Sequence, residues 1–502
     1  MNYAIPGASL RVAPSREQFR ELADRGNVIA VWAEFIADCE TPVSAFTKLG
    51  EAKYSFLFES TERNEISGRF SFLGAEPRLV VKAEANRILI REQGRERRLE
   101  RTGDPLEVLR ELMSRYRFVS SPSLPRFCGG AVGYFGYEVS THFQPKAGAA
   151  RHDELGLPEM MFMITSSLLV FDHRRRSLTI VVNVFREDGS LDEIYEDAVT
   201  KISQTVAKLG RVAELPLIET GQTRSIDPPR SNCSQAEFEA KVAHAKEYIA
   251  AGDIFQVVLS QRFETDFQGD PFHFYRCLRF INPSPYMFCL KFGDDFALVG
   301  SSPEMHVRVI HGAVEIRPIA GTRPRGTTAE QDEQFAAELL ADEKERAEHT
   351  MLVDLARNDI GRISEYGSVR VTELMNIERY SHVMHIVSNV TGKLRPQCDA
   401  YEAIRATFPA GTVSGAPKIR AMQIIGELEG TRRGCYAGAV GYIGFDGNLD
   451  SCITLRSAVL KNGKAYFQAG AGIVADSNPC AEYEETVNKA RAIARALALA
   501  NS

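Results

Sequence analysis

Residues 437–475 read AGAVGYIGFDGNLDSCITLRSAVLKNGKAYFQAGAGIVA, and this stretch carries the clearest information about the fold. Its apolar runs contain valine, isoleucine, phenylalanine and tyrosine, which favour extended strands. The polar segments FDGNL and KNGKA interrupt these runs, and Asp-Gly and Asn-Gly pairs favour tight turns between antiparallel strands. We therefore expect three extended runs folded as an antiparallel meander.

Helix and strand signals also appear further toward the N-terminus. Ser234–Ala251 has apolar residues at helical spacing behind a serine suited to an N-cap, and it predicts a helix. The next segment, IFQVVLSQRFET at residues 254–265, predicts a strand on which Gln256 points away from the more apolar face. Alternating runs in the first half likewise predict strands over Arg78–Arg91, Met160–Phe171 and Ser177–Phe185.

The length of 502 residues exceeds what one ordinary hydrophobic core supports. Residues 211–234 are rich in proline and polar residues without a sustained period, which is typical of a linker. We expect an N-terminal domain over residues 1–225 and a C-terminal domain over residues 226–502. A short echo, GAVGYFGYE at residues 130–138 and GAVGYIGFD at residues 438–446, suggests related hairpins in the two domains.

The composition excludes several classes of function. A net charge of −6 provides no basic field for nucleic acid, and no apolar run approaches the ~18 residues of a membrane span. The N-terminus lacks the features of a secretory signal or a transit peptide. Nine scattered cysteines without a CxxC pair fit a reducing compartment. The sequence therefore predicts a cytoplasmic protein that contacts neither nucleic acid nor membrane.

Pairs of glutamates recur on two predicted helices. Glu345 and Glu348 share a helical stripe with two leucines, Leu352 and Leu355. In the last helix, Glu482 and Glu485 similarly share a stripe with Lys489 and Ile493. Buried carboxylates must be neutralised, paired or bound to metal, and an oxygen-only ligand set favours Mg²⁺. Salt bridges are the open alternative, with three basic partners available: Arg346, Arg357 and Lys489.

Two other motifs have ordinary explanations. His382 and His385 are spaced to chelate a metal on a helix, but the β-branched residues that follow favour a strand or a short turn, and a hydrogen-bonded structural histidine at each position. FPAGTVSGAPK at residues 408–418 departs from a nucleotide-binding loop because its lysine does not directly follow a glycine. The helix that begins after it could receive a carboxylate, or its first residues could serve only as a cap.

Five stretches together resemble the chorismate-utilising enzymes, in particular the large (component I) subunits of anthranilate synthases. They are IRPIAGTRPRG, DEKERAEHTMLVDLARNDIGR, FPAGTVSGAPK, GCYAGAVGYIGFDGNLDSCITLRS and AGAGIVADSNPCAEYEETVNKARA, which lie in order between residues 233 and 500. The resemblance implies a two-domain α/β fold with antiparallel sheets flanked by helices and an active-site cleft in the C-terminal domain. It also implies that the chain is a lyase that binds chorismate and Mg²⁺.

The same resemblance implies roles for individual residues. Glu348 and Glu485 correspond to metal ligands, with Glu345 and Glu482 acting through bound waters. Glu304 matches a general acid that protonates the leaving hydroxyl. His385 corresponds to the histidine associated with pyruvate loss. The implied substrate-binding and pocket residues are Arg456, Lys489, Gly470, Ala471, Gly472, Tyr436, Gly321, Thr322 and Thr412.

Two substitutions distinguish the reaction from those of related enzymes. Aminodeoxychorismate synthases have a lysine nucleophile at the position of Ala320, and a methyl group cannot attack the ring. Isochorismate and salicylate synthases have a lysine that activates water at the position of Gln256, and a neutral amide is no general base. These residues leave amination by ammonia followed by pyruvate elimination, which gives anthranilate. A 2-amino-2-deoxyisochorismate synthase and a catalytically silent regulatory paralogue remain the alternatives.

The resemblance also implies partners. We find no region with the cysteine, histidine and glutamate of a glutaminase, so a separate glutamine amidotransferase subunit should deliver ammonia, in a heterotetramer of two large and two small subunits. Free ammonium is the alternative source. Tryptophan is the expected inhibitor, at a pocket resembling Glu59, Ser60, Pro285, Tyr286, Met287 and Phe288. Two features depart from the usual motif: Phe58 replaces a leucine, and the basic residue Arg69 stands in a shifted context.

Overall fold

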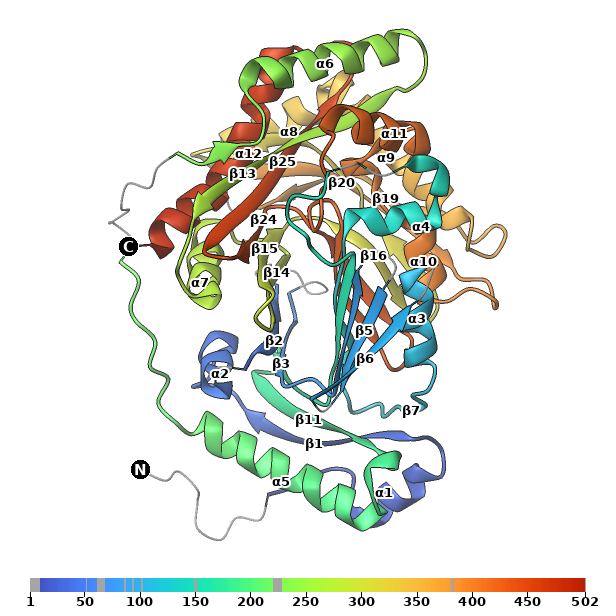
Figure 1. Ribbon diagram of the computed structural model, residues 1–502, viewed down its shortest axis with the longest axis vertical. Helices are drawn as coiled ribbons and strands as arrows, with labels where there is room; N and C mark the ends of the chain where they lie inside the picture. The colour runs from blue at the N-terminus through green and yellow to red at the C-terminus, as the bar shows by residue number, and fades with distance from the viewer. Residues whose placement is uncertain are drawn as a thin grey trace.

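The computed structural model describes residues 10–50, 52–60, 68–84, 87–92, 94–100, 103–148, 150, 152–219, 228–380 and 383–501. Within these residues, two large sheets pack against each other, and helices cover their outer sides (Figure 1). Strands from both halves of the sequence contribute to each sheet. The domain boundary predicted between residues 225 and 226 lies outside the described residues.

The first sheet has 13 strands in the described part of the chain, and its pairings are antiparallel except for β1 with β7. Its order is β12 (Arg230–Ser231), β13 (Gln256–Asp266), β25 (Lys464–Ile473), β24 (Ser457–Lys461), β15 (Phe296–Ser302), β14 (Tyr286–Phe292), β2 (Tyr54–Glu59), β3 (Phe70–Ala75), β10 (Ser167–Asp172), β11 (Ser177–Phe185), β1 (Val28–Ile36) and β7 (Phe118–Val119), with β21 (Gly415–Ala416) beside β13.

The second sheet has 12 strands in the described residues and is antiparallel. Its order is β18 (Ile319–Pro324), β20 (Val383–Lys393), β17 (Ala313–Ile316), β16 (Met305–Ile310), β23 (Leu449–Ile453), β22 (Ala439–Gly444), β8 (Gly130–Phe135), β9 (Met160–Ile164), β4 (Leu79–Glu84), β5 (Arg87–Glu92) and β6 (Arg95–Glu100), with β19 (Arg370–Arg379) beside β20.

The hydrophobic core lies in layers. Phe56, Phe72 and Phe288 from the first sheet meet Tyr134 and Tyr442 from the second. Outer apolar layers join the sheets to the helices. The helices are α1 (Arg16–Ala23), α2 (Pro42–Leu49), α3 (Pro105–Met113), α4 (Ser140–Phe143), α5 (Leu191–Leu209), α6 (Gln235–Ala250), α7 (Pro271–Ile281), α8 (Ala329–Ala341), α9 (Glu343–Gly361), α10 (Ala400–Thr407), α11 (Lys418–Glu429) and α12 (Pro479–Ala500), with short turns η1 (Tyr137–Val139), η2 (Pro145–Ala147), η3 (Arg186–Asp188) and η4 (Gly411–Val413).

The strand order repeats within each sheet. In the first sheet, the strands β13, β25, β24, β15 and β14 lie side by side and are followed by β2, β3, β10, β11 and β1. If the strands of each group are ranked by their order along the chain, the second group has the same ranks as the first, read in the opposite direction. The echoed segments form β8 and β22, which pair antiparallel at the centre of the second sheet with Gly133 opposite Gly441. Two similar halves related by a two-fold axis would produce this arrangement. The strand order therefore supports the interpretation of the echo as related hairpins.

The predicted meander is wrong in one respect. Residues 437–475 form four strands, and the first hairpin (β22, β23) belongs to the second sheet while the second hairpin (β24, β25) belongs to the first. The chain crosses between sheets at Thr454–Arg456. Turn residues predict hairpins correctly, but they carry no information about which sheet each hairpin joins.

The other predicted elements are confirmed. Helix α6 begins after Ser234, whose hydroxyl and Glu237 form a capping box, and β13 follows it. The alternating runs of the first half form β4, β5, β9, β10 and β11, with Met160–Phe171 divided between two strands. Among the helices of the described chain, none is long and apolar enough to cross a membrane.

Candidate active site

The two helices with paired glutamates bring those acids into one electrostatic cluster. Burial raises the pKa of Glu348 on α9, and the negative charges of Glu345 and of Glu485 on α12 raise it further. Burial and the charge of Glu485 also raise the pKa of Glu482, against the opposing effect of the Ser477 hydroxyl. Four carboxylates on two helices thus share one region, as their spacing predicts.

The inward stripe on α12 needs correction. Glu482 is buried, but the side chains of Glu485 and Lys489 are 47% and 48% exposed and form an ion pair of 2.6 Å. Such a pair at positions i and i+4 is stable at a hydrated helix surface, so these residues need not turn inward. The salt-bridge alternative therefore holds for Lys489.

The partners of the other acids differ from those considered from the sequence. Arg323 contacts Glu345 at 3.3 Å and Asp342, the N-cap of α9, at 2.8 Å. It comes from the arginine-rich IRPIAGTRPRG segment, which explains one of the cations there. Arg357 instead pairs with Asp354 at 2.9 Å. Helical spacing could not reveal Arg323, because it lies on β18 and not on the helix that carries the acids.

Strands β13 and β25 form one wall beside the acids. The buried Gln256 side chain donates a hydrogen bond from Nε2 to Glu348 Oε1 at 3.0 Å. A Cβ atom at Gly472 would lie 2.6 Å from the same Nε2, so glycine lets this strand approach. Lys489 Nζ donates to the carbonyl oxygen of Gly470 at 3.0 Å. The side chain of Ala471 packs in the apolar layer, so only its main chain contributes to the site side of the wall.

Tyr436 closes the other side of this glycine strand. A Cβ atom at Gly470 would lie 2.8 Å from the Tyr436 hydroxyl, so these two residues are in close contact. The tyrosine is buried, as its predicted pocket position requires.

Glu304 and Arg456 meet where two chain segments pass between the sheets. Glu304 lies between β15 and β16, and Arg456 lies between β23 and β24. The main chains are hydrogen-bonded at this corner, from Ile453 N to Glu304 O at 3.0 Å and from Ser301 N to Arg456 O at 3.1 Å. The Arg456 backbone has φ +46, and its guanidinium forms no ion pair with any described residue. An unpaired arginine here is available to a ligand carboxylate.

Glu304 has the properties of a proton donor. Burial raises its pKa to about 8, although the Thr412 hydroxyl, the Ile319 N–H and the positive charges of Arg456 and Lys489 act in the opposite direction. The hydroxyl of Thr412, on η4, is buried and makes no well-aligned hydrogen bond with the described residues. At neutral pH the Glu304 carboxyl is therefore mainly protonated, and the Thr412 hydroxyl lies beside it.

His385 lies on β20 with a defined tautomer. Its Nδ1 is 2.8 Å from the carbonyl oxygen of Gly321 and 3.1 Å from the Thr322 hydroxyl. A carbonyl can only accept, so Nδ1 carries the proton and Nε2 is left as an acceptor. Burial lowers the pKa of His385 to about 4, which keeps the ring neutral. The predicted strand and hydrogen bond are confirmed, while His382 lies outside the described residues.

The segment that contains Ala320 lies beside His385 and the acids. Ala320 pairs with Ile386 across β18 and β20. At Gly321, with φ +68, a Cβ atom would lie 3.1 Å from Glu345 Oε2. A lysine at position 320 would place an amine next to this region, whereas alanine provides none.

The donor chemistry of the acid cluster fits a hard cation, since all four groups offer carboxylate oxygens. In the described parts of the chain, no three or more His, Cys, Asp or Glu side chains are gathered closely enough to hold one ion. The predicted arrangement has two direct ligands, Glu348 and Glu485, and leaves the remaining positions to water and substrate. These two carboxylates are electrostatically coupled.

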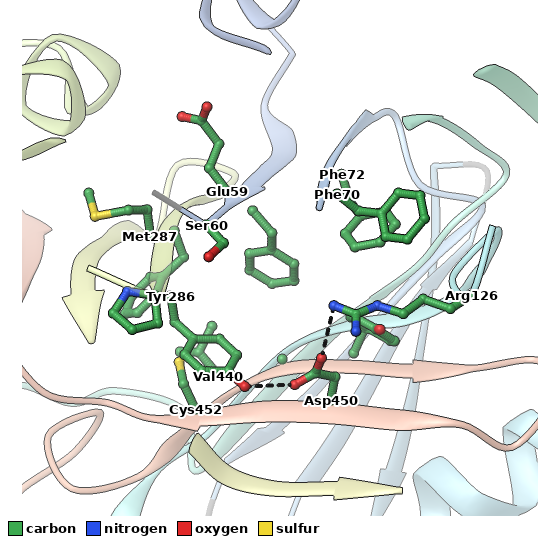
Figure 2. Close-up of a pocket in the computed structure, with 15 residues that line it drawn as sticks. Glu59, Ser60, Phe70, Phe72, Arg126, Tyr286, Met287, Val440, Asp450 and Cys452 are labelled. Carbon is green, nitrogen blue, oxygen red and sulfur yellow. Dashed lines mark hydrogen bonds and ion pairs between the residues drawn. The ribbon is translucent and has the colours of Figure 1, made fainter. Parts of the chain in front are cut away.

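A second pocket opens between the sheets (Figure 2). Its empty space of about 460 Å³ includes open solvent, and all six residues predicted for an inhibitor line it. Further lining residues come from both halves of the chain: Phe58, Phe70, Phe72, Arg126, Val440, Gly441, Tyr442, Asp450 and Cys452. The pocket thus combines aromatic rings with charged groups of both signs.

Two details of this pocket differ from the prediction. The Glu59 carboxylate points away from Arg126 and Asp450 (Figure 2) and is bound by Arg279 at 3.0 Å and by the Tyr275 hydroxyl. The cation of the pocket is Arg126, which lies 3.4 Å from Asp450, rather than Arg69, which binds Asp172. No sequence signal distinguished Arg126 and Asp450, because pairs that meet across strands are set by tertiary packing.

Ser60 is one of three lining residues with a buried polar atom that has no hydrogen-bond partner in the described part of the chain, together with Arg126 (Nε) and Tyr442 (hydroxyl). The Ser60 Oγ points toward the pocket interior (Figure 2). Tyr286 donates to Asp450 Oδ1 at 3.1 Å and so is already satisfied.

Comparison with known proteins agrees with this geometry. Residues 53–495 match the chorismate binding enzyme family. The chain is 48% identical over 489 residues to anthranilate synthase component 1 of Acetivibrio thermocellus, covering 96% of this chain and 98% of that protein. It is also 48% identical over 487 residues to the protein of that name from Aquifex aeolicus, covering 97% and 98%.

Solved structures have a fold similar to that of this chain. The crystal structure of anthranilate synthase component I from Streptococcus pneumoniae is similar, with a TM-score of 0.75 and 39% identity over 91% of this chain and 98% of that one. The menaquinone-specific isochorismate synthase of Escherichia coli shares the fold, with a TM-score of 0.71 and 19% identity over 96% and 98%.

Glu348→Gln should raise the apparent melting temperature by about 1–2 °C near neutral pH in buffer containing a chelator. The raised pKa of Glu348 means that its ionised form is less favourable in the folded than in the unfolded chain. The increase in melting temperature should be present at pH values above the folded-state pKa of Glu348. It should disappear as the pH falls below the pKa of an ordinary glutamate. Thermal unfolding across this range tests it, with the exposed Glu484→Gln as the control. A lower melting temperature for Glu348→Gln at neutral pH would contradict the crowding of these carboxylates.

Proposed function

Because the chain belongs to the chorismate binding enzyme family, we propose that it is the chorismate-binding component of an anthranilate synthase. The reaction joins chorismate and ammonia and releases anthranilate, pyruvate and water, which makes the enzyme an oxo-acid lyase. The observation that carries this proposal is the buried Glu304, a neutral acid beside Arg456, which forms no ion pair with the residues that the structure describes. Ala320 and Gln256 support ammonia as the nucleophile, since neither side chain can attack the ring or activate water.

Substrate binding would use the cationic and glycine-rich side of the site. Arg456 can make two parallel hydrogen bonds to one carboxylate of chorismate. Lys489 and the main chain at Gly470–Gly472 would bind the other, because Lys489 already touches the Gly470 carbonyl. The Thr412 hydroxyl, buried beside Glu304, would orient the ring hydroxyl.

The first chemical step would form a carbon–nitrogen bond and break the bond to the ring hydroxyl. Glu304 gives its proton to that hydroxyl, which leaves as water while ammonia adds to the ring carbon beside the one that bears the carboxylate. A protonated acid at this position avoids expelling hydroxide into a buried site.

The second step would remove pyruvate. His385 is suited to take the proton from the aminated ring carbon, because its Nε2 is unprotonated and its Nδ1 is held by the Gly321 carbonyl. Loss of that proton and departure of the enolpyruvyl group make the ring aromatic. The low pKa of His385 keeps it in the basic form at neutral pH.

Mg²⁺ is the proposed cofactor. Glu348 and Glu485 would hold it directly, and Glu345 and Glu482 would hold its waters. When bound, the ion would neutralise charge on the ring carboxylate and assist departure of the hydroxyl. The hydrogen bond from Gln256 fixes one oxygen of Glu348, which prepares that carboxylate for a ligand.

The partners follow from the component naming of the relatives. We propose that a glutamine amidotransferase subunit supplies ammonia, in a heterotetramer of two large and two small subunits. All nine cysteines are free, which supports a reducing, cytoplasmic location.

The pocket between the sheets is proposed to bind tryptophan as a feedback inhibitor. Its aromatic rings suit an indole, and Arg126, Asp450 and the free Ser60 hydroxyl suit the charged amino acid group. Two strands connect this pocket to the corner that holds Glu304 and Arg456. On β14, Tyr286 pairs with Ser302, and on β23, Cys452 pairs with Met305. Both positions are within two residues of Glu304.

Purified protein with chorismate, Mg²⁺ and ammonium at mildly basic pH should produce anthranilate and pyruvate in equal amounts. Anthranilate fluorescence and a coupled pyruvate assay measure the two products. A chelator should stop the reaction, and glutamine alone should not replace ammonium. Accumulation of 2-amino-2-deoxyisochorismate without pyruvate would assign the chain to the related synthase, and no consumption of chorismate would indicate a silent paralogue.

Glu304→Gln should lower kcat by about 100- to 10,000-fold, since it removes the general acid. In the wild-type enzyme, the acid is protonated below its pKa of about 8, so activity should fall as pH rises through that value. Rates must be compared at a fixed concentration of free ammonia, because raising the pH also deprotonates ammonium. The residual activity of the variant should lack this alkaline limb, and a limb that persists would remove Glu304 from the role.

Ser60→Ala should raise the tryptophan concentration for half-inhibition by about fivefold, the value of one buried hydrogen bond. Because the Ser60 hydroxyl has no partner in the described protein, its removal should not lower the melting temperature. Inhibition is measured as a fraction of the uninhibited rate of each variant. Ser140→Ala, which removes another buried and unpartnered hydroxyl, is the matched control. Equal sensitivity of the two variants would contradict the assigned pocket.

A further inference from the structure

A buried arginine lies behind the wall of the active site, and the reaction described above does not use it. Arg433 follows α11 and is 2% exposed. Its guanidinium donates to both carboxylate oxygens of Glu429, at 2.6 and 2.8 Å. It also donates to two main-chain carbonyl oxygens, those of Val413 at 2.7 Å and Val258 at 2.8 Å. One side chain thus bonds the end of α11, the turn that contains Val413 and the sequence-distant strand β13.

Each of the two carbonyls belongs to a segment that carries a site residue. Val413 directly follows Thr412, whose hydroxyl lies beside Glu304. Val258 lies on β13 directly opposite Gly472 of the glycine strand. The guanidinium therefore fixes the position of the Thr412 turn relative to the strand that would bind the substrate carboxylate.

Glu429 extends these contacts along the same strand. Its Oε1 accepts hydrogen bonds from the main-chain N–H of Ser260 at 2.8 Å and from the Ser260 hydroxyl at 2.7 Å. Ser260 lies opposite Gly470 in the pairing of β13 with β25. Gln468, also on β25, donates to the same hydroxyl at 2.8 Å. The ion pair is therefore bonded to β13 at positions opposite both glycines of the wall.

Aromatic rings and a second acid complete the surroundings of Arg433. Its guanidinium lies 4.7 Å from the ring centre of Tyr137 and 5.5 Å from that of Tyr436. Tyr436, which contacts Gly470, is itself a residue of the predicted site, so here the arginine touches a site residue directly. Glu138 accepts the main-chain N–H groups of Arg433 and Gly434 at 2.8 and 3.1 Å. The arginine is held from both halves of the chain.

We propose that the Arg433–Glu429 pair is a positioning unit for the anthranilate synthase reaction, which holds Thr412, Tyr436 and Gly470–Gly472 in one fixed geometry. The inference rests on the proposed function. Arg433 does not touch the substrate; it acts through the segments that do.

The chemistry of the pair favours positioning over stability alone. The cost of desolvating two charges offsets much of their attraction, so a buried ion pair is a poor source of net stability. An apolar side chain of similar size could fill the same volume. Only the planar fork of arginine can bond a carboxylate and two separate carbonyls at once, and lysine cannot reproduce this geometry.

Arg433→Lys tests the proposal, because it keeps the charge and loses the fork. We expect kcat to fall about 10- to 100-fold, the cost of a displacement on the order of 1 Å at a reacting group. The alkaline limb assigned to Glu304 should also move to higher pH, since the Thr412 hydroxyl lowers the pKa of Glu304 and would withdraw with its turn. A purely structural role would leave this limb unchanged.

Arg78→Lys is the matched control. The Arg78 side chain is 8% exposed, contacts Asp188 at 2.6 Å and Glu187 at 2.7 Å, and lies over the ring of Phe185 at 4.2 Å. It lies at the opposite end of the fold from the acid cluster, beside β11. Its variant should lose a comparable amount of thermal stability while kcat and the alkaline limb stay at wild-type values.

Glu429→Gln provides a second measurement and replaces Arg433→Lys if that variant does not fold. It keeps the shape of the side chain and should shift the same limb in the same direction. The positioning role is overturned if either variant has the same loss of melting temperature as Arg78→Lys and also the same kcat and the same alkaline limb of the pH profile as that control. Failure of the proposed function is separate, because it would appear as wild-type protein that makes no anthranilate.

Discussion

The site depends on a corner where two neighbouring segments pass together from one sheet to the other. Glu304 sits on the passage from β15 to β16, and Arg456 sits on the passage from β23 to β24. Main-chain hydrogen bonds join the passages on both sides of the corner. An acid and a cation are therefore held next to each other by the backbone rather than by a salt bridge, which leaves both free for a substrate.

The repeated strand order makes the first half a natural comparison. There, β3 passes to β4 near Glu76 and β9 passes to β10 at Thr165 and Ser166, with Arg78 N bonded to Ile164 O at 2.8 Å. The Ser166 hydroxyl donates to the Glu76 carbonyl at 3.2 Å, and no arginine stands where Arg456 does. The first-half corner thus has a serine where the second half has Arg456, and its own arginine, Arg78, is already paired with Asp188 and Glu187. The two halves share an architecture, while the proposed chemistry is confined to one.

Patterns within single elements of the sequence predicted the features that depend on nearby residues alone, such as helix faces and tight turns. The 3.6-residue spacing found the acids on α9 and α12, and turn residues found both hairpins of residues 437–475. The sheet crossing at Arg456, the pairing of Arg323 with Glu345 and the contacts of Arg433 were beyond prediction, because each depends on how separate elements pack and not on a pattern within one element. Glu304 gave no periodic signal at all and was identified only through resemblance. Side-chain direction at Glu59 was likewise set by Arg279 on a distant helix.

The position of the second pocket explains how an inhibitor could act at a distance without a mobile lid. The pocket lies where β2 meets β14 and where β8 meets β22, which is the junction of the two similar halves. From there β14 is bonded to β15, and β23 runs directly into the corner. Because paired strands move together, a ligand that separated the halves would shift Glu304 relative to Arg456. A change of one ångström there is enough to matter, because proton transfer requires hydrogen-bond distance.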